Sequence, residues 1–384
     1  MKSAHGDDQL IKNQDLTLKE MDFSYEKLKI YNMSNHLSYW LYTREQLRGE
    51  LLNMSDPSMI KSTNFNAKNP IKILVHDWLG SFYDKEYFCS HIMKTYLRAE
   101  RCNVICVDWK QLTYDLFYAS AKINVKYIGY DIAKVLNILT NNMKVGSENI
   151  HLIGHGMGAH IVGYTGKKLN GQIPRITGLD PVLPLYENTD PKYRINKNDA
   201  TFVDIIHTNG NSFGLFKSLG HIDFYPSGGK SQLNCKVLDK VTGGACSHAK
   251  AIEYFAHSIL FKEEYKSFQC ASWREFRVGE CGEYANSTYM GEHVDKKYSG
   301  RKCVWRENII SVNQCQNDVS KTTTDKPEVI IYESRISTGY QIITTVSVDE
   351  KVSDMFIVYI DIPEYWNCNI VIINRPFSTQ INVV

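Results

Sequence analysis

The stretch Ile150-His-Leu-Ile-Gly-His-Gly-Met-Gly-Ala-His160 decides the fold of this chain. Its first four residues are mostly apolar, which predicts a buried strand. Glycines at alternate positions follow, at Gly154, Gly156 and Gly158, and they predict a tight turn. The residues after the turn suit a helix. The sequence therefore predicts a strand that passes through a sharp turn into a helix.

A turn of this kind is the setting of the G-x-S-x-G nucleophile elbow, in which a serine hydroxyl projects into a cleft. Here the central residue is Gly156. The elbow residue normally has unfavourable backbone angles, which cost about 1–3 kcal/mol for a residue with a Cβ atom, whereas glycine adopts them readily. Glycine therefore keeps the turn, relieves its strain and removes the attacking oxygen, as expected of a natural loss of catalysis.

The regions around this stretch alternate between strands and helices. Isoleucine, valine and leucine at 128, 132, 135, 136 and 139 recur at spacings of three and four, which predicts one apolar face on a helix. The alternation indicates an α/β fold with a largely parallel sheet flanked by helices. Buried strands of that sheet are expected at residues 71–75, 104–107, 150–153, 175–178 and 202–207.

The character of the chain changes after Cys315. Residues 317–327 are polar and lack periodicity, which is typical of a linker. We therefore expect a main domain over residues 1–316 and a small β-rich module over 328–384. Within the module, strands are expected at residues 329–332, 341–348, 355–360 and 370–373.

Composition narrows the class of protein. The 384 residues are 43% hydrophobic and 22% charged, as in ordinary globular proteins. The formal net charge is +2 and the basic residues are dispersed, so nucleic acid is not an expected partner. No stretch approaches the ~20 apolar residues that a membrane span requires, so any membrane contact is expected to be peripheral.

Sequence blocks on both sides of the elbow resemble the secreted lipase family of animals, which includes pancreatic lipases, phospholipases A1 and insect relatives. The resemblance extends over roughly residues 65 to 290 and implies the α/β-hydrolase fold. The blocks are Val75-His-Asp-Trp-Leu-Gly-Ser81, Asn103-Val-Ile-Cys-Val-Asp-Trp109, the elbow, Ile176-Thr-Gly-Leu-Asp-Pro181, Asp199-Ala-Thr-Phe-Val-Asp-Ile-Ile-His-Thr208, Gly220-His-Ile-Asp-Phe-Tyr-Pro226 and Cys246-Ser-His-Ala-Lys-Ala251.

The resemblance also implies a degenerate catalytic site. Asp180 matches the family's acid and His248 its general base, and they follow Gly156 in the order nucleophile, acid, base. The oxyanion donors are expected to be the backbone N–H groups of Trp78 and Met157. Asp77 replaces the usual glycine before Trp78, and its carboxylate would oppose a developing negative charge if it pointed inward.

Further site features follow from the same resemblance. Phe213, Leu215 and Phe216 are available to line an acyl groove, although ordinary packing explains them equally well. A disulfide between Cys235 and Cys246 would close a short lid and leave the cleft open. Near Asp199, Asn196 stands where an acid is expected and Lys197 adds positive charge, so no calcium and no other metal or cofactor is expected.

The ten cysteines indicate disulfides and an oxidising compartment. Cys270 with Cys281 matches a family pair, and Cys89 with Cys102 is expected from position. Cys106 lies in a strand and is expected to be a buried thiol, whereas the pairing of Cys303, Cys315 and Cys368 stays open. Glycosylation sequons occur at Asn32, Asn53 and Asn286. The polar amino terminus lacks a signal peptide, so we expect a secreted chain from which the signal has been removed.

Three functions remain open. The first is a catalytically inactive lipase homologue, a pseudoenzyme, that binds a hydrophobic or lipid-like ligand in the former acyl cleft or serves as a storage protein, as insect yolk proteins of this family do. The second is an active carboxylic-ester hydrolase of phospholipase A1 type with an unorthodox nucleophile. The third is a structural or partner-binding secreted protein. Oligomeric state is not indicated by the sequence.

Overall fold

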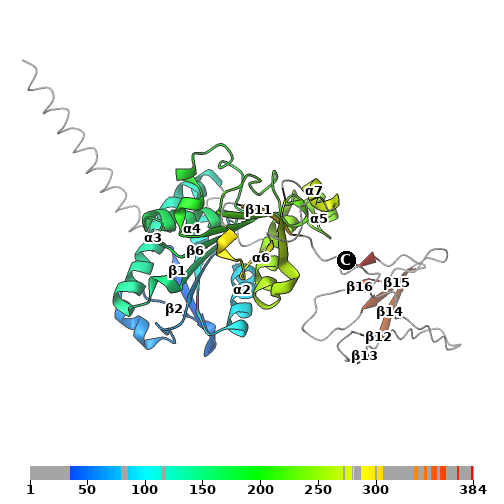
Figure 1. Ribbon diagram of the computed structural model, residues 1–384. Coiled ribbons are helices and arrows are strands. Elements are labelled where there is room, and N and C mark those ends of the chain that lie inside the picture. The colour runs from blue at the N-terminus through cyan, green and yellow to red at the C-terminus, as the bar shows by residue number, and fades with distance from the viewer. Residues whose placement is uncertain are drawn as a thin grey trace, which may run out of the picture. The chain divides into compact units, whose positions relative to one another are not determined.

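A computed structural model describes residues 35–78, 85–113, 118–270, 273–278, 280, 287–298 and 301–305, together with short strands between 333 and 383. The chain divides into two compact units, Met1–Glu307 and Asn308–Val384. The first unit has the predicted α/β fold, an α/β-hydrolase architecture with a mostly parallel central sheet (Figure 1).

The described part of the first unit contains an 11-stranded sheet in the order β10-β9-β11-β8-β7-β6-β5-β3-β4-β1-β2. Its centre is parallel, from β11 through β4, and the strands at both edges are antiparallel. The strands are β1 Ser38–Thr43, β2 Gln46–Leu51, β3 Ile71–Val75, β4 Asn103–Asp108, β5 Ile150–His155, β6 Arg175–Leu179, β7 Val203–Ile206, β8 Ile222–Phe224, β9 Lys266–Gln269, β10 Ser287–Tyr289 and β11 Arg301–Trp305.

All five strands predicted for the parallel sheet are present as β3 to β7. Every residue of β3, β5 and β6 is buried, because helices cover both faces of the sheet and leave neither face for water. The antiparallel strands β1 and β2 at one edge were not predicted from the sequence.

Helices cover the two faces of the sheet in pairs (Figure 1). The predicted helix is part of α3, which packs with α4 against one face and forms one apolar core with it. On the other face, α2 and α6 pack together and form a second core. The helices are α2 Lys85–Ala99, α3 Tyr118–Met143, α4 Met157–Lys168, α5 Lys236–Thr242, α6 Ala245–Leu260 and α7 Trp273–Val278.

One predicted disulfide is wrong. Cys89 is bonded to Cys106 on β4, and Cys102 is a buried free thiol. Cys89 lies near the start of α2, and the helix then runs on to Ala99, about 15 Å at 1.5 Å per residue. Cys102 lies beyond the end of that helix, whereas the Cα atoms of Cys89 and Cys106 are 6.0 Å apart, within the ~7 Å that a disulfide allows. The buried free thiol predicted at Cys106 is therefore also wrong.

The other cysteine predictions have different outcomes. The disulfide between Cys235 and Cys246 is confirmed. Cys270 is disulfide-bonded, but its predicted partner Cys281 lies outside the described residues, as do Cys315 and Cys368.

The second unit contains antiparallel strand pairs, as expected of a small β module. They are β12 Glu333–Arg335 with β13 Gln341–Ile343, β14 Ser347–Val352 with β15 Met355–Tyr359, and β16 Ile370–Val371 with β17 Asn382–Val383. The strand predicted at 329–332 lies outside the described residues. Among the helices that the structure describes, none is both long and apolar enough to cross a membrane.

Candidate functional site

The elbow forms between β5 and α4, as the glycine pattern predicts. Gly156 joins them with φ 56° and ψ −115°, a left-handed conformation that residues with a Cβ atom rarely adopt. Gly158, in the first turn of α4, lies so close to β3 that a Cβ there would be 2.1 Å from the carbonyl oxygen of Val75. Both glycines are therefore required by the sharp reversal of the chain.

Asp180 and His248 are in contact, although 68 residues separate them. Asp180 follows β6 and is fully buried, and one of its oxygens accepts hydrogen bonds from the backbone N–H groups of Thr208 and Asn209. Its other oxygen lies 2.6 Å from Nδ1 of His248, on α6. The carboxylate therefore fixes the imidazole so that Nε2 points away from Asp180.

The carboxylate of Asp77 points into the predicted oxyanion hole. Its Oδ1 accepts hydrogen bonds from the backbone N–H groups of Trp78, at 2.7 Å, and Met157, at 2.5 Å. Its Oδ2 lies 3.0 Å from Nε2 of His248. The two groups that the resemblance identified as oxyanion donors are therefore brought together, and a side chain of this protein already uses both of them.

Asp77 also fills the space beside Gly156. A Cβ atom at residue 156 would lie 2.1 Å from Cγ of Asp77 and 2.3 Å from each of its oxygens. Real Cβ atoms essentially never make contacts below about 3.0 Å, so the neighbouring group would have to shift. A serine at 156 would therefore require the Asp77 carboxylate to move away from the position in which it accepts hydrogen bonds from Trp78 and Met157.

His248 is an imidazolium held between two carboxylates. Burial alone would lower its pKa, but hydrogen bonds to Asp180 and Asp77, together with their charges, raise the pKa to about 10. For Asp77, burial alone would raise the pKa, but the hydrogen bond from His248 and its charge lower it. His248 is therefore positively charged at neutral pH and lies between the carboxyl groups of Asp180 and Asp77.

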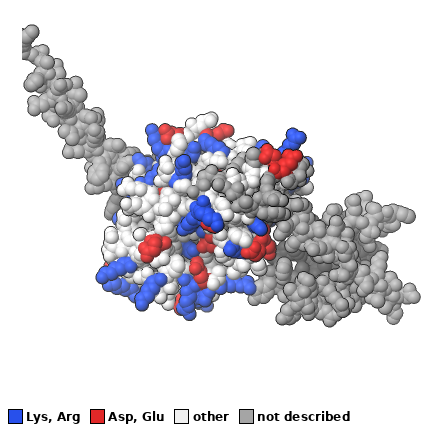
Figure 2. Space-filling model, viewed as in Figure 1, with Lys and Arg blue, Asp and Glu red and all other residues white. Residues whose placement is uncertain are grey.

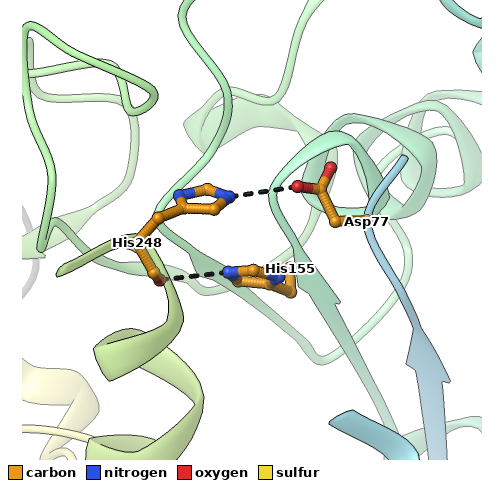
Figure 3. A group of neighbouring side chains, drawn as sticks. All are labelled: Asp77, His155 and His248. Carbon is orange, nitrogen blue, oxygen red and sulfur yellow. Dashed lines mark hydrogen bonds and ion pairs between the residues drawn. The ribbon is translucent and has the colours of Figure 1, made fainter. Parts of the chain in front are cut away.

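His155, the last residue of β5, is a member of the site that the sequence analysis missed (Figure 3). Its Nε2 lies 3.1 Å from the carbonyl oxygen of His248, and the two rings are 4.3 Å apart. Burial and the neighbouring charge of His248 lower its pKa to about 4, so His155 is neutral at physiological pH. Its position between Gly154 and Gly156, within the predicted turn, could have identified it as a site residue.

Asp77, His155 and His248 offer ligand atoms within 4.8 Å of one another, which is close enough for a metal ion. However, His248 Nε2 and Asp77 Oδ2 are hydrogen-bonded to each other. A proton therefore takes the bridging position that a metal ion would need.

The three apolar residues predicted for the acyl groove lie in different environments. Phe213 is half-buried, and its ring centre lies 5.8 Å from that of His248. Phe216 packs against Tyr225. Leu215 is 1% exposed and belongs to the core, so its predicted role in an open groove is wrong. Its side chain packs into the apolar core on the α3 and α4 face of the sheet.

The lid predicted between Cys235 and Cys246 contains the short helix α5. Its apolar residues face outward: Val237 is 76% exposed, Leu238 54% and Val241 84%. Gly243 ends this helix. A Cβ atom built at this glycine would lie 3.8 Å from Cζ of Phe213. The lid therefore presents an exposed apolar surface and ends beside the ring next to His248.

The segment resembling a calcium site holds a lysine that the sequence analysis did not identify. Nζ of Lys167, on α4, lies 2.7 Å from Oδ2 of Asp199 and 2.7 Å from the carbonyl oxygen of Arg194. Asn196 directs its amide N–H toward the same carboxylate. Lys197, which was expected to supply the positive charge, is exposed. The absence of calcium stays a prediction.

Two other predictions concern the surface. Asn53 is exposed, whereas Asn32 and Asn286 lie outside the described residues, and glycosylation stays a prediction. On the face shown in Figure 2, basic and acidic side chains are interspersed.

The strand, glycine turn and helix, together with the Asp180–His248 pair, define the class of this protein as an α/β hydrolase in fold. A protein-family model described as "Lipase" matches residues 7–317. The chain belongs to the lipase family.

Similar curated proteins carry lipase names. Pancreatic lipase-related protein 2 of Cavia porcellus is 36% identical over 250 residues, 63% of this chain and 56% of that protein. Pancreatic triacylglycerol lipase of Equus caballus is 32% identical over 305 residues, which cover 74% of this chain and 64% of that protein. Inactive pancreatic lipase-related protein 1 of Mus musculus is 33% identical over 301 residues, which cover 73% of this chain and 61% of that protein. The chain thus spans less than two thirds of the length of these relatives.

Proposed function

We propose that this protein is a secreted, catalytically inactive member of the lipase family that binds a hydrophobic or lipid-like ligand. The observation that carries the proposal is the position of the Asp77 carboxylate. Hydrolysis of an ester by this fold requires an attacking oxygen at the elbow and free donors for the oxyanion. Gly156 has no side-chain oxygen, and both donors already bind Asp77.

The charge at the site also opposes ester hydrolysis. His248 would act as a general base in its neutral form, but the two carboxylates keep it protonated by raising its pKa to about 10. An incoming oxyanion would additionally meet the negative charge of Asp77. These effects act together against the transition state of acyl transfer.

The lid supports binding of an apolar ligand. Val237, Leu238 and Val241 expose apolar side chains on one short helix, and the helix ends beside Phe213. Such a surface loses contact with water when an apolar ligand or a lipid surface covers it, at ~25 cal/mol for each Å². The presence of an inactive lipase-related protein among the similar proteins is consistent with this function.

The catalytic part is tested with a fluorophosphonate probe and with short-chain ester and phospholipid substrates. We expect background signals, because no serine oxygen lies beside His248. Stoichiometric phosphonylation of any residue near His248 would contradict the proposal.

The binding part is tested by native mass spectrometry of source-purified protein and by flotation with phosphatidylcholine vesicles. A Val237→Ser/Val241→Ser variant should bind vesicles less than the wild type. Leu47→Ser is the matched control, because Leu47 is 61% exposed but lies on β2, outside the lid. The structural or storage function would be favoured if mass spectrometry found no bound ligand and if all variants bound vesicles equally.

A further inference from the structure

The carboxylate of Asp77 has the surroundings of a nucleophile. One oxygen accepts two backbone hydrogen bonds, and the other lies 3.0 Å from the Nε2 atom of His248, which Asp180 orients. The Asp77 side chain is 20% exposed, so it is accessible to a small molecule. Its Cγ lies 2.1 Å from the position of a Cβ at residue 156, the place from which a serine would act.

The choice of electrophile follows from the occupied oxyanion hole. Attack on an ester carbonyl creates an oxyanion on the substrate, and both backbone donors are already used. Attack on a saturated carbon of an epoxide leaves the charge on an alkoxide, which can take a proton from His248 Nε2 and so does not need those two donors. Carboxylates are established nucleophiles in covalent catalysis, and an alkyl ester formed on Oδ2 would leave its own carbonyl oxygen, Oδ1, between the two donors.

We propose that Asp77 attacks an apolar epoxide and that the resulting ester is hydrolysed at the same site to a diol. This activity goes beyond the proposed function, whose inactivity is argued for carboxylic esters alone, since it needs no serine and leaves the protein inactive on those esters.

In the first step, a lone pair of Oδ2 forms a bond to one epoxide carbon, and the ring C–O bond breaks. The alkoxide takes the proton from Nε2 of His248. The products are a hydroxyalkyl ester of Asp77 and a neutral imidazole. Loss of the negative charge on Asp77 removes one of the two groups that keep His248 protonated, so the histidine is then able to act as a base.

In the second step, water attacks Cγ of Asp77 and gives a proton to Nε2. The electron pair of the carbonyl moves to Oδ1, which the N–H groups of Trp78 and Met157 stabilise. Collapse of this intermediate breaks the Cγ–Oδ2 bond, and the departing diol oxygen takes the proton back from His248. The new carboxylic acid then protonates His248, which restores the starting state. Epoxide and water are consumed and a diol is formed.

The surroundings favour an apolar substrate. The Trp78 ring lies 5.1 Å from that of Tyr118, and burial together with the charge of Asp77 raises the pKa of Tyr118, so this phenol stays neutral. Phe213 lies on the side of His248. Aromatic rings of this kind would bind the alkyl chain of a medium-length epoxide.

The proposal is tested by peptide mapping after incubation with 1,2-epoxyoctane. In His248→Gln, water has to protonate the alkoxide of the first step in place of the histidine, and the second step loses its base, which typically slows hydrolysis about 10²-fold or more. Over a long incubation, an adduct of the probe's mass should therefore accumulate on Asp77. Asp77→Asn should show no adduct at this peptide. An unlabelled Asp77 in His248→Gln would overturn the proposal, and so would equal labelling of the peptide in Asp77→Asn.

A measurement on the unaltered protein covers the case in which His248→Gln does not fold. A single turnover of 1,2-epoxyoctane in ¹⁸O-water should place the heavy oxygen in the Asp77 carboxylate, because water attacks Cγ. Absence of diol, or heavy oxygen found only in the diol, would overturn the proposal.

Discussion

The elbow and the segment around Asp199 each hold a carboxylate against a basic side chain, but the two carboxylates differ in burial and in how well their charge is stabilised. Asp77 is 20% exposed and interacts with His248, which Asp180 also holds, and its pKa is lowered. Asp199 is 1% exposed, and burial raises its pKa to about 6 despite the contact with Lys167. The comparison teaches that Lys167 and the N–H groups of Asn196 do not offset the burial of Asp199, whereas His248 and the backbone donors more than offset that of Asp77.

The largest effect is therefore expected at the second region. Lys167→Met should lower the free energy of unfolding by about 3–5 kcal/mol, the usual cost of removing one partner of a buried ion pair. Urea denaturation measures this loss. Lys168→Met is the control, because Lys168 is exposed and its loss should change stability by less than about 0.5 kcal/mol. Equal effects of the two variants would show that Asp199 does not depend on Lys167.

The next largest effect on stability is expected from the overlap between a side chain at residue 156 and the Asp77 carboxylate. Gly156→Ser alone should destabilise the fold by about 1–3 kcal/mol through its positive φ, with an added cost from the overlap with Asp77, and it should stay unreactive to a fluorophosphonate. Gly156→Ser with Asp77→Gly should react, because the hole is then open and Asp180 still orients His248. Asp77→Gly alone is the control. A folded double variant without reaction would show that the Asp–His pair is not preorganised for catalysis.

A smaller effect is expected on the protonation of His248. Asp77→Asn removes one carboxylate, which should lower the His248 pKa from about 10 by about 1–3 units, as measured by NMR of the labelled ring. Because the folded pKa lies above the unfolded value of about 6.5, the associated stabilisation is complete below pH ~6.5 and is lost as pH rises to about 10. The stability difference between wild type and variant should narrow over this range. An unchanged pKa would mean that Asp77 does not hold the proton.

The smallest expected effect is that of calcium. Neither calcium chloride nor a chelator should shift the melting temperature, because the ammonium of Lys167 already contacts Asp199 and Asn196 supplies an amide in place of a carboxylate. A stabilisation approaching ~2.7 kcal/mol at a hundredfold excess over Kd would contradict this.

Periodicity and glycine spacing were sufficient to predict the α/β fold, since buried parallel strands leave continuous apolar runs such as that of β3. The edge strands β1 and β2 were missed, because they form an antiparallel pair outside the alternation of strands and helices, and neither is a continuous buried run. The cysteine pairs show the same limit. Cys235 and Cys246 enclose a short loop, whereas the choice of Cys106 over Cys102 depends on where α2 begins.

At the site, the resemblance was sufficient to identify Asp180, His248 and the two backbone donors. The resemblance left open whether Asp77 points inward. The direction of this side chain depends on its contact with Met157, which is 80 residues away in the sequence. Lys167 was missed for the same reason. It lies on α4, far in sequence from the acidic segment that it neutralises.

The overlap between residue 156 and Asp77 also sets the number of substitutions that a serine-dependent site at this elbow would need. A serine at 156 alone overlaps the Asp77 carboxylate, and a glycine at 77 alone frees the two backbone N–H groups but places no attacking oxygen beside them. Neither single substitution provides both parts of such a site, so the two positions would have to change together.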